Sequence, residues 1–219
     1  MALDRKKLQK KKAKQAAKAK SRRLKASARQ PAGEGKHHTA IAAALNAPVY
    51  ECWMPQKLFQ NPGIGSVVFS RSADGGNILA AGFLLDVYCL GVKDAFIRLM
   101  TPADYTVLLD RFRGYGPLEA IEPACARKLV ESAEAYARDL GFSAYKDYRK
   151  SRRIFSDIDG NDCPHSFTFG FEGKPLFSAG PHDRPGKVKR VIRTLEKRCG
   201  KGGFHFLTPV ASEDLDGYV

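Results

Sequence analysis

The sequence contains no apolar stretch approaching the roughly 18 to 20 residues that a membrane-spanning helix requires. Its first residues are charged and lack the apolar core of a secretory signal. The five cysteines are an odd number, lie far apart and include no Cys-x-x-Cys pair. These absences lead us to expect reduced thiols in a cytoplasmic protein that is neither secreted nor bound to a membrane.

Signatures of familiar activities are also missing. Neither standard glycine-rich phosphate loop occurs, and there is no aromatic RNA-recognition signature and no Gly-x-x-Gly clamp. The histidines and cysteines show no arrangement of nucleophile and base, and Cys163 and His165 match no compact zinc spacing. No motif assigns the chain to a family, and we expect no cofactor and no bound metal.

Positive charge is concentrated at the amino terminus. The 219 residues carry a formal net charge of +14. Residues 1–36 contain 14 Lys and Arg against only Asp4 and Glu34, which leaves a net charge of +2 on the remaining 183 residues. Within that remainder, residues 145–201 form a second basic region with a net charge of +7, and residues 202–219 are acidic. Such a distribution is typical of proteins with a polyanionic partner.

The amino-terminal segment is too polar to fold alone. Between Arg5 and Arg29 only Leu8 and Leu24 are large and apolar. We expect a disordered basic arm over residues 1–36 that becomes helical along a phosphate backbone, with affinity that falls steeply with salt. The predicted phosphate contacts in the arm are Lys6, Lys7, Lys10, Lys11, Lys12, Lys14, Lys18, Lys20, Arg22, Arg23 and Lys25. A solubilising tail, a targeting signal and a membrane-surface helix are the alternatives, and the apolar face is too thin for the last.

The rest of the chain alternates strand and helix patterns. Strands are predicted over 49–53, 65–71, 78–90 and 203–207, and helices over 40–46, 101–113, 122–140 and 184–199. The alternating phenylalanines at 167, 169 and 171 predict a hairpin with 175–178. Because regular βαβ spacing is absent, we expect an α+β fold with an antiparallel or mixed sheet and packed helices. The predicted domain spans 37–207, could divide near residue 115, and precedes a loose acidic tail over 208–219.

Two basic segments of this domain suit nucleic acid. One is residues 145–153, where Tyr145 and Tyr148 alternate with cations and could stack on bases. The other is the outer face of the last predicted helix. The candidate contacts are Arg149, Lys150, Arg152, Arg153, Lys187, Arg190, Arg193 and Lys197. The plainer interpretation is an amphipathic helix whose solvated face happens to be basic.

Four aspartates offer a catalytic alternative. Asp86, Asp94, Asp157 and Asp159 could share a divalent ion in a nuclease or phosphodiesterase. A buried strand aspartate is more often a hydrogen-bonded structural residue. The leading expectation is therefore a protein without enzymatic activity that binds nucleic acid, RNA in preference to DNA, in a ribosome or other ribonucleoprotein. A protein-interaction domain localised by its basic arm is the third hypothesis.

Overall fold

The structure is a computed structural model that describes residues 33–180 and 183–207. The chain divides into two units, residues 1–40 and 41–219, and the description below concerns the second. Residues 1–32 of the predicted basic arm over 1–36, and the predicted acidic tail over 208–219, lie outside the described residues. In the part of the chain that is described, no helix has the length and apolar character needed to cross a membrane.

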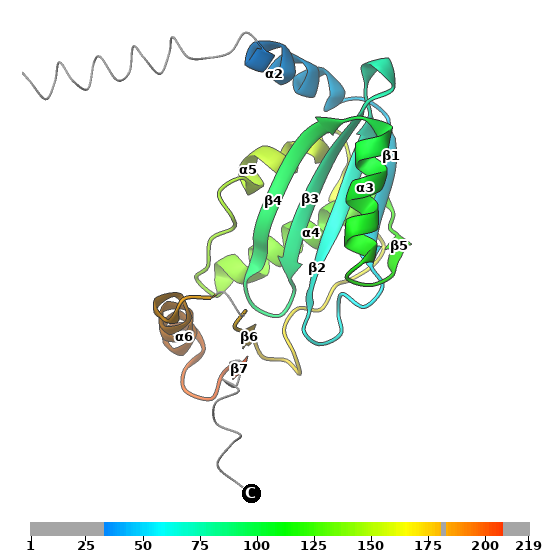
Figure 1. Ribbon diagram of the computed structural model, residues 1–219. Coiled ribbons are helices and arrows are strands. Elements are labelled where there is room, and N and C mark those ends of the chain that lie inside the picture. Colours follow the sequence, from blue (N-terminus) through cyan, green and yellow to red (C-terminus); the bar gives the residue numbers. More distant parts are fainter. Residues whose placement is uncertain (1–32, 181–182, 208–219) are drawn as a thin grey trace, which may run out of the picture. The chain divides into compact units, whose positions relative to one another are not determined.

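A five-stranded antiparallel sheet forms the centre of the fold (Figure 1). Its strand order is β4-β3-β2-β1-β5. The strands are β1 (Val49–Pro55), β2 (Ile64–Ser72), β3 (Ile78–Asp86), β4 (Gly91–Met100) and β5 (Leu118–Ala120). The turn between β2 and β3 is the short 3-10 helix η1 (Asp74–Gly76). Because β2 and β3 lie inside the sheet with helices on both sides, five of the nine residues of β2 and eight of the nine residues of β3 are buried.

Helices cover both faces of this sheet. On one face, α3 (Pro102–Arg113) places Tyr105 and Leu109 against Val68 and Ala80 (Figure 1). On the other face, α4 (Pro123–Asp139) packs its apolar stripe on the main core. The same face carries α5 (Tyr148–Ser151) and the 3-10 helix η2 (Arg152–Phe155). These layers confirm the expected α+β class.

The carboxy-terminal elements form a smaller cluster. A two-stranded parallel sheet pairs β6 (Leu176–Ser178) with β7 (His205–Leu207), and α6 (Pro185–Cys199) lies between them in the chain. The predicted hairpin over residues 165–178 is therefore wrong, since Phe171 and Lys174 form only an isolated bridge. The alternating phenylalanines Phe167, Phe169 and Phe171 all pack on the core, but their segment is not a strand of a β-sheet.

One strand was also predicted too long. The strand predicted over 78–90 ends at Asp86, whose Oδ1 accepts hydrogen bonds from the backbone N–H groups of Tyr88 (3.1 Å) and Cys89 (2.9 Å). The chain then reverses at Gly91, whose φ is +61°. A Cβ there would lie 2.6 Å from the carbonyl oxygen of Ala133, so this close approach to α4 requires glycine. Strands β4 and β5 were not predicted.

The amino-terminal helix is longer than predicted. We expected residues 40–46 to be helical after a break at the Pro and Gly cluster, whereas α2 spans Gly33–Ala44. Glycine lowers helix propensity by only about 1 kcal/mol relative to Ala, so Gly33 and Gly35 weaken this helix without forbidding it.

Two cysteines are paired, which corrects the expectation of reduced thiols. Cys125, in the first turn of α4, forms a disulfide with Cys163, which follows the 3-10 helix η3 (Gly160–Asp162). Cys52, Cys89 and Cys199 are free. Burial raises the pKa of the Cys52 thiol to about 12, so that side chain serves as apolar packing. The disulfide also removes the cysteine argument for a reducing compartment.

Candidate nucleic-acid interface

The strongest candidate site is built on α6. The helix begins with Pro185 at its first position. Proline is tolerated there because the N–H of the first helical residue has no acceptor within the helix. Val191 and Leu195 are buried against Cys89 and Phe177 from the rest of the fold. This apolar stripe fixes which face of the helix points to solvent.

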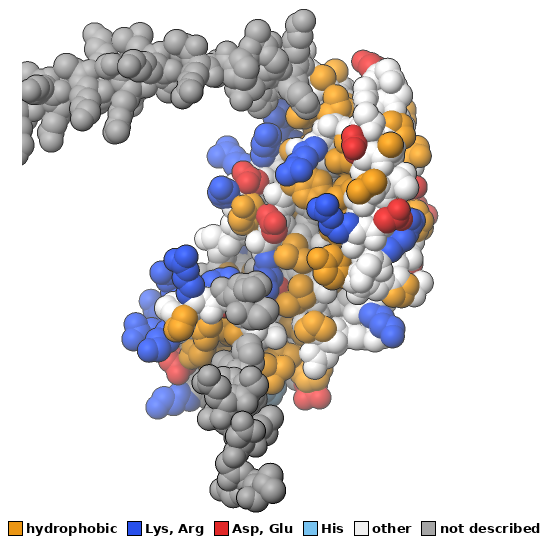
Figure 2. Space-filling view, viewed as in Figure 1, with side chains coloured by type: hydrophobic (Ala, Val, Ile, Leu, Met, Phe, Trp, Pro, Cys, Tyr) orange, Lys and Arg blue, Asp and Glu red, His pale blue; other side chains and the backbone are white. Residues whose placement is uncertain are grey.

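The solvent face of α6 is mostly cationic, and Glu196 is the one exposed carboxylate of the helix. It carries Lys189, Arg190, Arg193, Lys197 and Arg198, all exposed. Steps of three and four residues place Arg190, Arg193 and Lys197 on one line along the helix. None of these five cations forms an ion pair with any described residue. The helix therefore concentrates positive charge that no described ion pair neutralises, and Figure 2 shows Lys and Arg side chains gathered in the region of α6.

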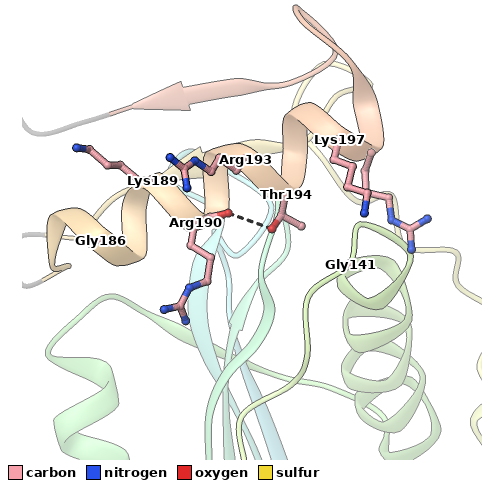
Figure 3. A pocket seen from close by; sticks show the side chains of 8 residues that line it. Gly141, Gly186, Lys189, Arg190, Arg193, Thr194 and Lys197 are labelled. Carbon is pink, nitrogen blue, oxygen red and sulfur yellow. Dashed lines mark hydrogen bonds between the residues drawn. The ribbon is translucent and has the colours of Figure 1, made fainter.

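A cavity of about 930 Å³ follows this face (Figure 3). Its lining contains no carboxylate and consists of Gly141, Gly186, Lys189, Arg190, Arg193, Thr194, Lys197 and Arg198. Gly141, immediately after α4, has a φ of +92°, and a Cβ there would lie 3.2 Å from Thr194 Cγ2. The glycine thus lets the end of α4 approach α6 closely and shape one wall of the cavity.

The predicted contact Lys187 does not belong to this cavity. Its Nζ forms an ion pair with Asp183 Oδ1 at 2.6 Å. Although burial raises the pKa of Asp183, hydrogen bonds from Lys187 and the Gly180 backbone lower it overall. Lys187 is therefore already neutralised and is the weakest of the four predicted contacts on α6.

A second basic cavity, of about 610 Å³, lies beside α5 and η2. Three predicted cations, Arg149, Arg152 and Arg153, line it together with Arg127 of α4. Glu131 neutralises part of this charge through ion pairs with Arg127 (3.2 Å) and Arg152 (3.3 Å). The predicted contact Lys150 is exposed but does not line the cavity. The two basic cavities share no lining residue, so the structure resolves the predicted surface into two separate sites.

Of the two tyrosines in this second segment, Tyr148 does not offer a stacking surface. Tyr148 is buried, its ring lies 6.3 Å from that of Phe83, and burial raises the pKa of its hydroxyl to about 12. Tyr145 is half-buried and packs on the core, with the Lys146 ammonium 5.8 Å from its ring centroid. The prediction that both rings stack on bases is wrong for Tyr148, because α5 turns that side chain inward.

Similarity to other proteins adds nothing to this geometry. No protein-family model, curated protein or solved structure matches the chain. The functional interpretation therefore depends on the residues themselves.

The four aspartates of the catalytic alternative have separate structural roles. Asp86 is buried at the end of β3, and Asp94 is exposed on β4, where its carboxylate accepts from the Ala95 N–H. Asp157 forms an ion pair with Arg71. Asp159 accepts from the Asn161 N–H at the start of η3. Only Asp157 and Asp159 line one cavity, and the described residues contain no group of three His, Cys, Asp or Glu able to hold a metal ion.

Some lining residues were missed from the sequence. Lys189 and Arg127 were not predicted as contacts, although each lies one helical turn from a partner in its cavity, Arg193 and Glu131 respectively. Helical spacing could have found Lys189. Gly141 could not be found, because its role depends on the contact between α4 and α6.

Proposed function

We propose that the protein binds RNA and that the cationic face of α6 is a principal contact of the folded domain. One observation carries the proposal: five exposed cations on one helix line a cavity without a single carboxylate. Charges of one sign held close together repel one another, and a polyanion relieves that repulsion while releasing its counterions.

The chemistry of the cavity favours phosphate contacts over the reading of bases. Lys and Arg donate to phosphate oxygens, and Arg does so through two parallel N–H groups. The lining contains no Asn or Gln, the side chains that pair with adenine edges. Binding is therefore expected to depend little on sequence.

RNA is preferred over duplex DNA because the site is concave. Duplex DNA presents its phosphates on a convex cylinder, whereas single-stranded or looped RNA can bend a phosphate into a cavity. The basic arm over residues 1–36 is proposed to add sequence-independent affinity, and the cavity beside α5 to hold a further phosphate. Association with a ribonucleoprotein and a cytoplasmic location are part of the same proposal.

The proposal is tested by removing the charge of α6 alone. The triple variant Arg190→Ala, Arg193→Ala, Lys197→Ala should bind a fluorescent 20-nucleotide single-stranded RNA at least about tenfold more weakly at low salt. A matched variant that removes three exposed cations elsewhere, Lys57→Ala, Arg98→Ala, Arg111→Ala, has the same net charge and should lose much less affinity. Equal losses in the two variants would show that only the total charge matters, and duplex DNA is the comparison ligand.

A further inference from the structure

An aromatic groove lies along the segment that follows the disulfide. A cavity of about 610 Å³ is lined by the rings of Phe59, Tyr88, Phe167 and Phe171. A second cavity of about 310 Å³ adjoins it, and Met54, His165 and Phe167 line both. We call the two together the aromatic groove. It is separate from both basic cavities, with which it shares no lining residue.

The charged side chains that line the groove are acidic. In a protein with a net charge of +14, no Lys or Arg lines either part of it. Glu172 lines one end and Glu122 the other, and both are exposed. Past Glu122 a third cavity contains Asp159 and Asp162, so the carboxylates continue beyond the groove. Phosphate groups are repelled from such a surface and cations are attracted.

Aromatic rings beside carboxylates favour cationic side chains with apolar stems. The negative face of a ring attracts an ammonium or guanidinium group, and the methylene stem of Lys or Arg packs on the ring. Phe59 and Phe167 stack with centroids 5.9 Å apart, and Phe171 contacts Tyr88 at 5.5 Å. These mutual contacts, and the hydrogen bond from Tyr88 to the Phe59 carbonyl, hold the wall of the groove in place.

The backbone along the groove is unpaired. Residues 166–168 belong to no helix or strand, and none of their N–H or C=O groups forms a hydrogen bond within the described residues. Ser166 and Thr168 are exposed, so these backbone groups border solvent. A stretch of free backbone beside side-chain pockets is the arrangement that binds an extended peptide by strand addition.

We propose that the aromatic groove binds an extended basic segment of a partner protein. The peptide backbone pairs with residues 166–168, its cationic side chains lie near Glu122 and Glu172, and an apolar side chain contacts Phe167. This site is independent of the RNA site, since it neither uses α6 nor requires nucleic acid.

The test uses the full chain, treated with nuclease and freed of nucleic acid so that no polyanion captures the probe. The probe is a fluorescent seven-residue peptide with Lys, Leu and Arg at alternate positions and Gly between them. It should bind with saturation, and a peptide with Glu in place of both cations should not. The double variant Glu122→Gln, Glu172→Gln should bind the basic peptide about fivefold more weakly, a loss expected for two exposed ion pairs.

Two controls keep the result specific. Asp74→Asn, at the turn between β2 and β3, removes one negative charge outside the groove and should leave peptide affinity unchanged. The α6 triple variant should also bind the peptide normally while losing RNA, so the two proposals fail separately. Absence of saturable binding, or equal binding of the acidic peptide, overturns the proposal. Displacement of self-associated chains by the peptide would also overturn it, because the occupant would then be a second copy.

Discussion

Arg71 is the largest fully buried side chain among the described residues, and every polar group of its guanidinium has a partner. Nε donates to the Ile154 carbonyl (2.7 Å), and Nη1 donates to the Ala47 carbonyl (2.6 Å). Nη2 donates to the Phe155 carbonyl (3.1 Å) and to Asp157 Oδ1 (2.7 Å). The hydrogen bond from Arg71 holds the pKa of Asp157 below its usual range. One residue of β2 thus anchors both η2 and the segment after it.

Replacing Arg71 should strongly destabilise the fold. Arg71→Ala removes the donor to the Ala47 and Ile154 carbonyls, whereas the Phe155 carbonyl still accepts from the Ile158 N–H. We expect the free energy of unfolding to fall by about 3 to 5 kcal/mol. Asp157→Asn should cost far less, since 69% of the Asp157 side chain is exposed and water can replace the ion pair. Urea denaturation followed by circular dichroism measures both variants. A small loss for Arg71→Ala would contradict the anchoring role.

The buried carboxylate of Asp86 makes the stability of the fold depend on pH. Burial raises its pKa to about 6, against the lowering effects of Lys93 and of the Cys89 and Tyr88 backbone N–H groups. Its Oδ2 has no hydrogen-bond partner among the described residues. The folded state therefore binds the proton of Asp86 more tightly than the unfolded state does. Protonation of Asp86 stabilises the fold most below about pH 4, and this stabilisation is lost as the pH rises through 6.

A comparison with Asp86→Asn isolates this effect. Between pH 4 and pH 7, the free energy of unfolding should shift in favour of the variant by up to about 3 kcal/mol relative to the wild type. Chemical denaturation of both proteins across this range gives the difference at each pH. A constant difference would show that Asp86 has an ordinary pKa in the folded protein.

At the scale of elements, the sequence predicted the helices well and the sheet in part. Thr101 and Pro102 marked the start of α3, and the Thr101 hydroxyl does accept a hydrogen bond from the Asp104 N–H. Strand β4 was missed because the apolar run through Leu90 hides a turn that depends on the Asp86 carboxylate and on Gly91. The hairpin over 165–178 was wrong because β6 pairs with the distant β7, a contact that no local pattern encodes.

The candidate site was likewise predicted from the sequence only in part. Helical spacing identified Arg190, Arg193 and Lys197 on α6, because residues three or four positions apart lie on the same face of a helix. The cavity itself depends on Gly141 approaching Thr194, which is a tertiary contact. The disulfide was missed for the same reason, since Cys125 and Cys163 are 38 residues apart.

The disulfide should stabilise the segment that contains the aromatic groove. A crosslink closing a loop of this length is expected to raise the free energy of unfolding by about 2 to 4 kcal/mol. Cys163→Ser should therefore unfold at lower urea than the oxidised wild type and at nearly the same urea as the reduced wild type. The oxidised, denatured wild type should show three reactive thiols, from Cys52, Cys89 and Cys199. Five reactive thiols would contradict the pairing.

At the scale of the whole molecule, the described cationic cavity and the described acidic groove lie on different parts of the surface. Five cations of α6 line a cavity that contains no carboxylate, whereas the aromatic groove is lined by Glu122 and Glu172 and by no Lys or Arg. A surface divided in this way can hold a polyanion and a basic polypeptide at once without competition between them. This arrangement fits a protein that joins RNA to a protein partner, which is the role we propose.

The most direct test of this account is the salt dependence of RNA binding by the α6 triple variant. Each phosphate contact contributes about 0.7 to the slope of log affinity against log salt for single-stranded nucleic acid. Removing the charges of Arg190, Arg193 and Lys197 should therefore make the slope shallower by about 2, a change that the matched variant of Lys57, Arg98 and Arg111 should not reproduce. Parallel salt titrations for the wild type and the α6 variant would contradict the central claim.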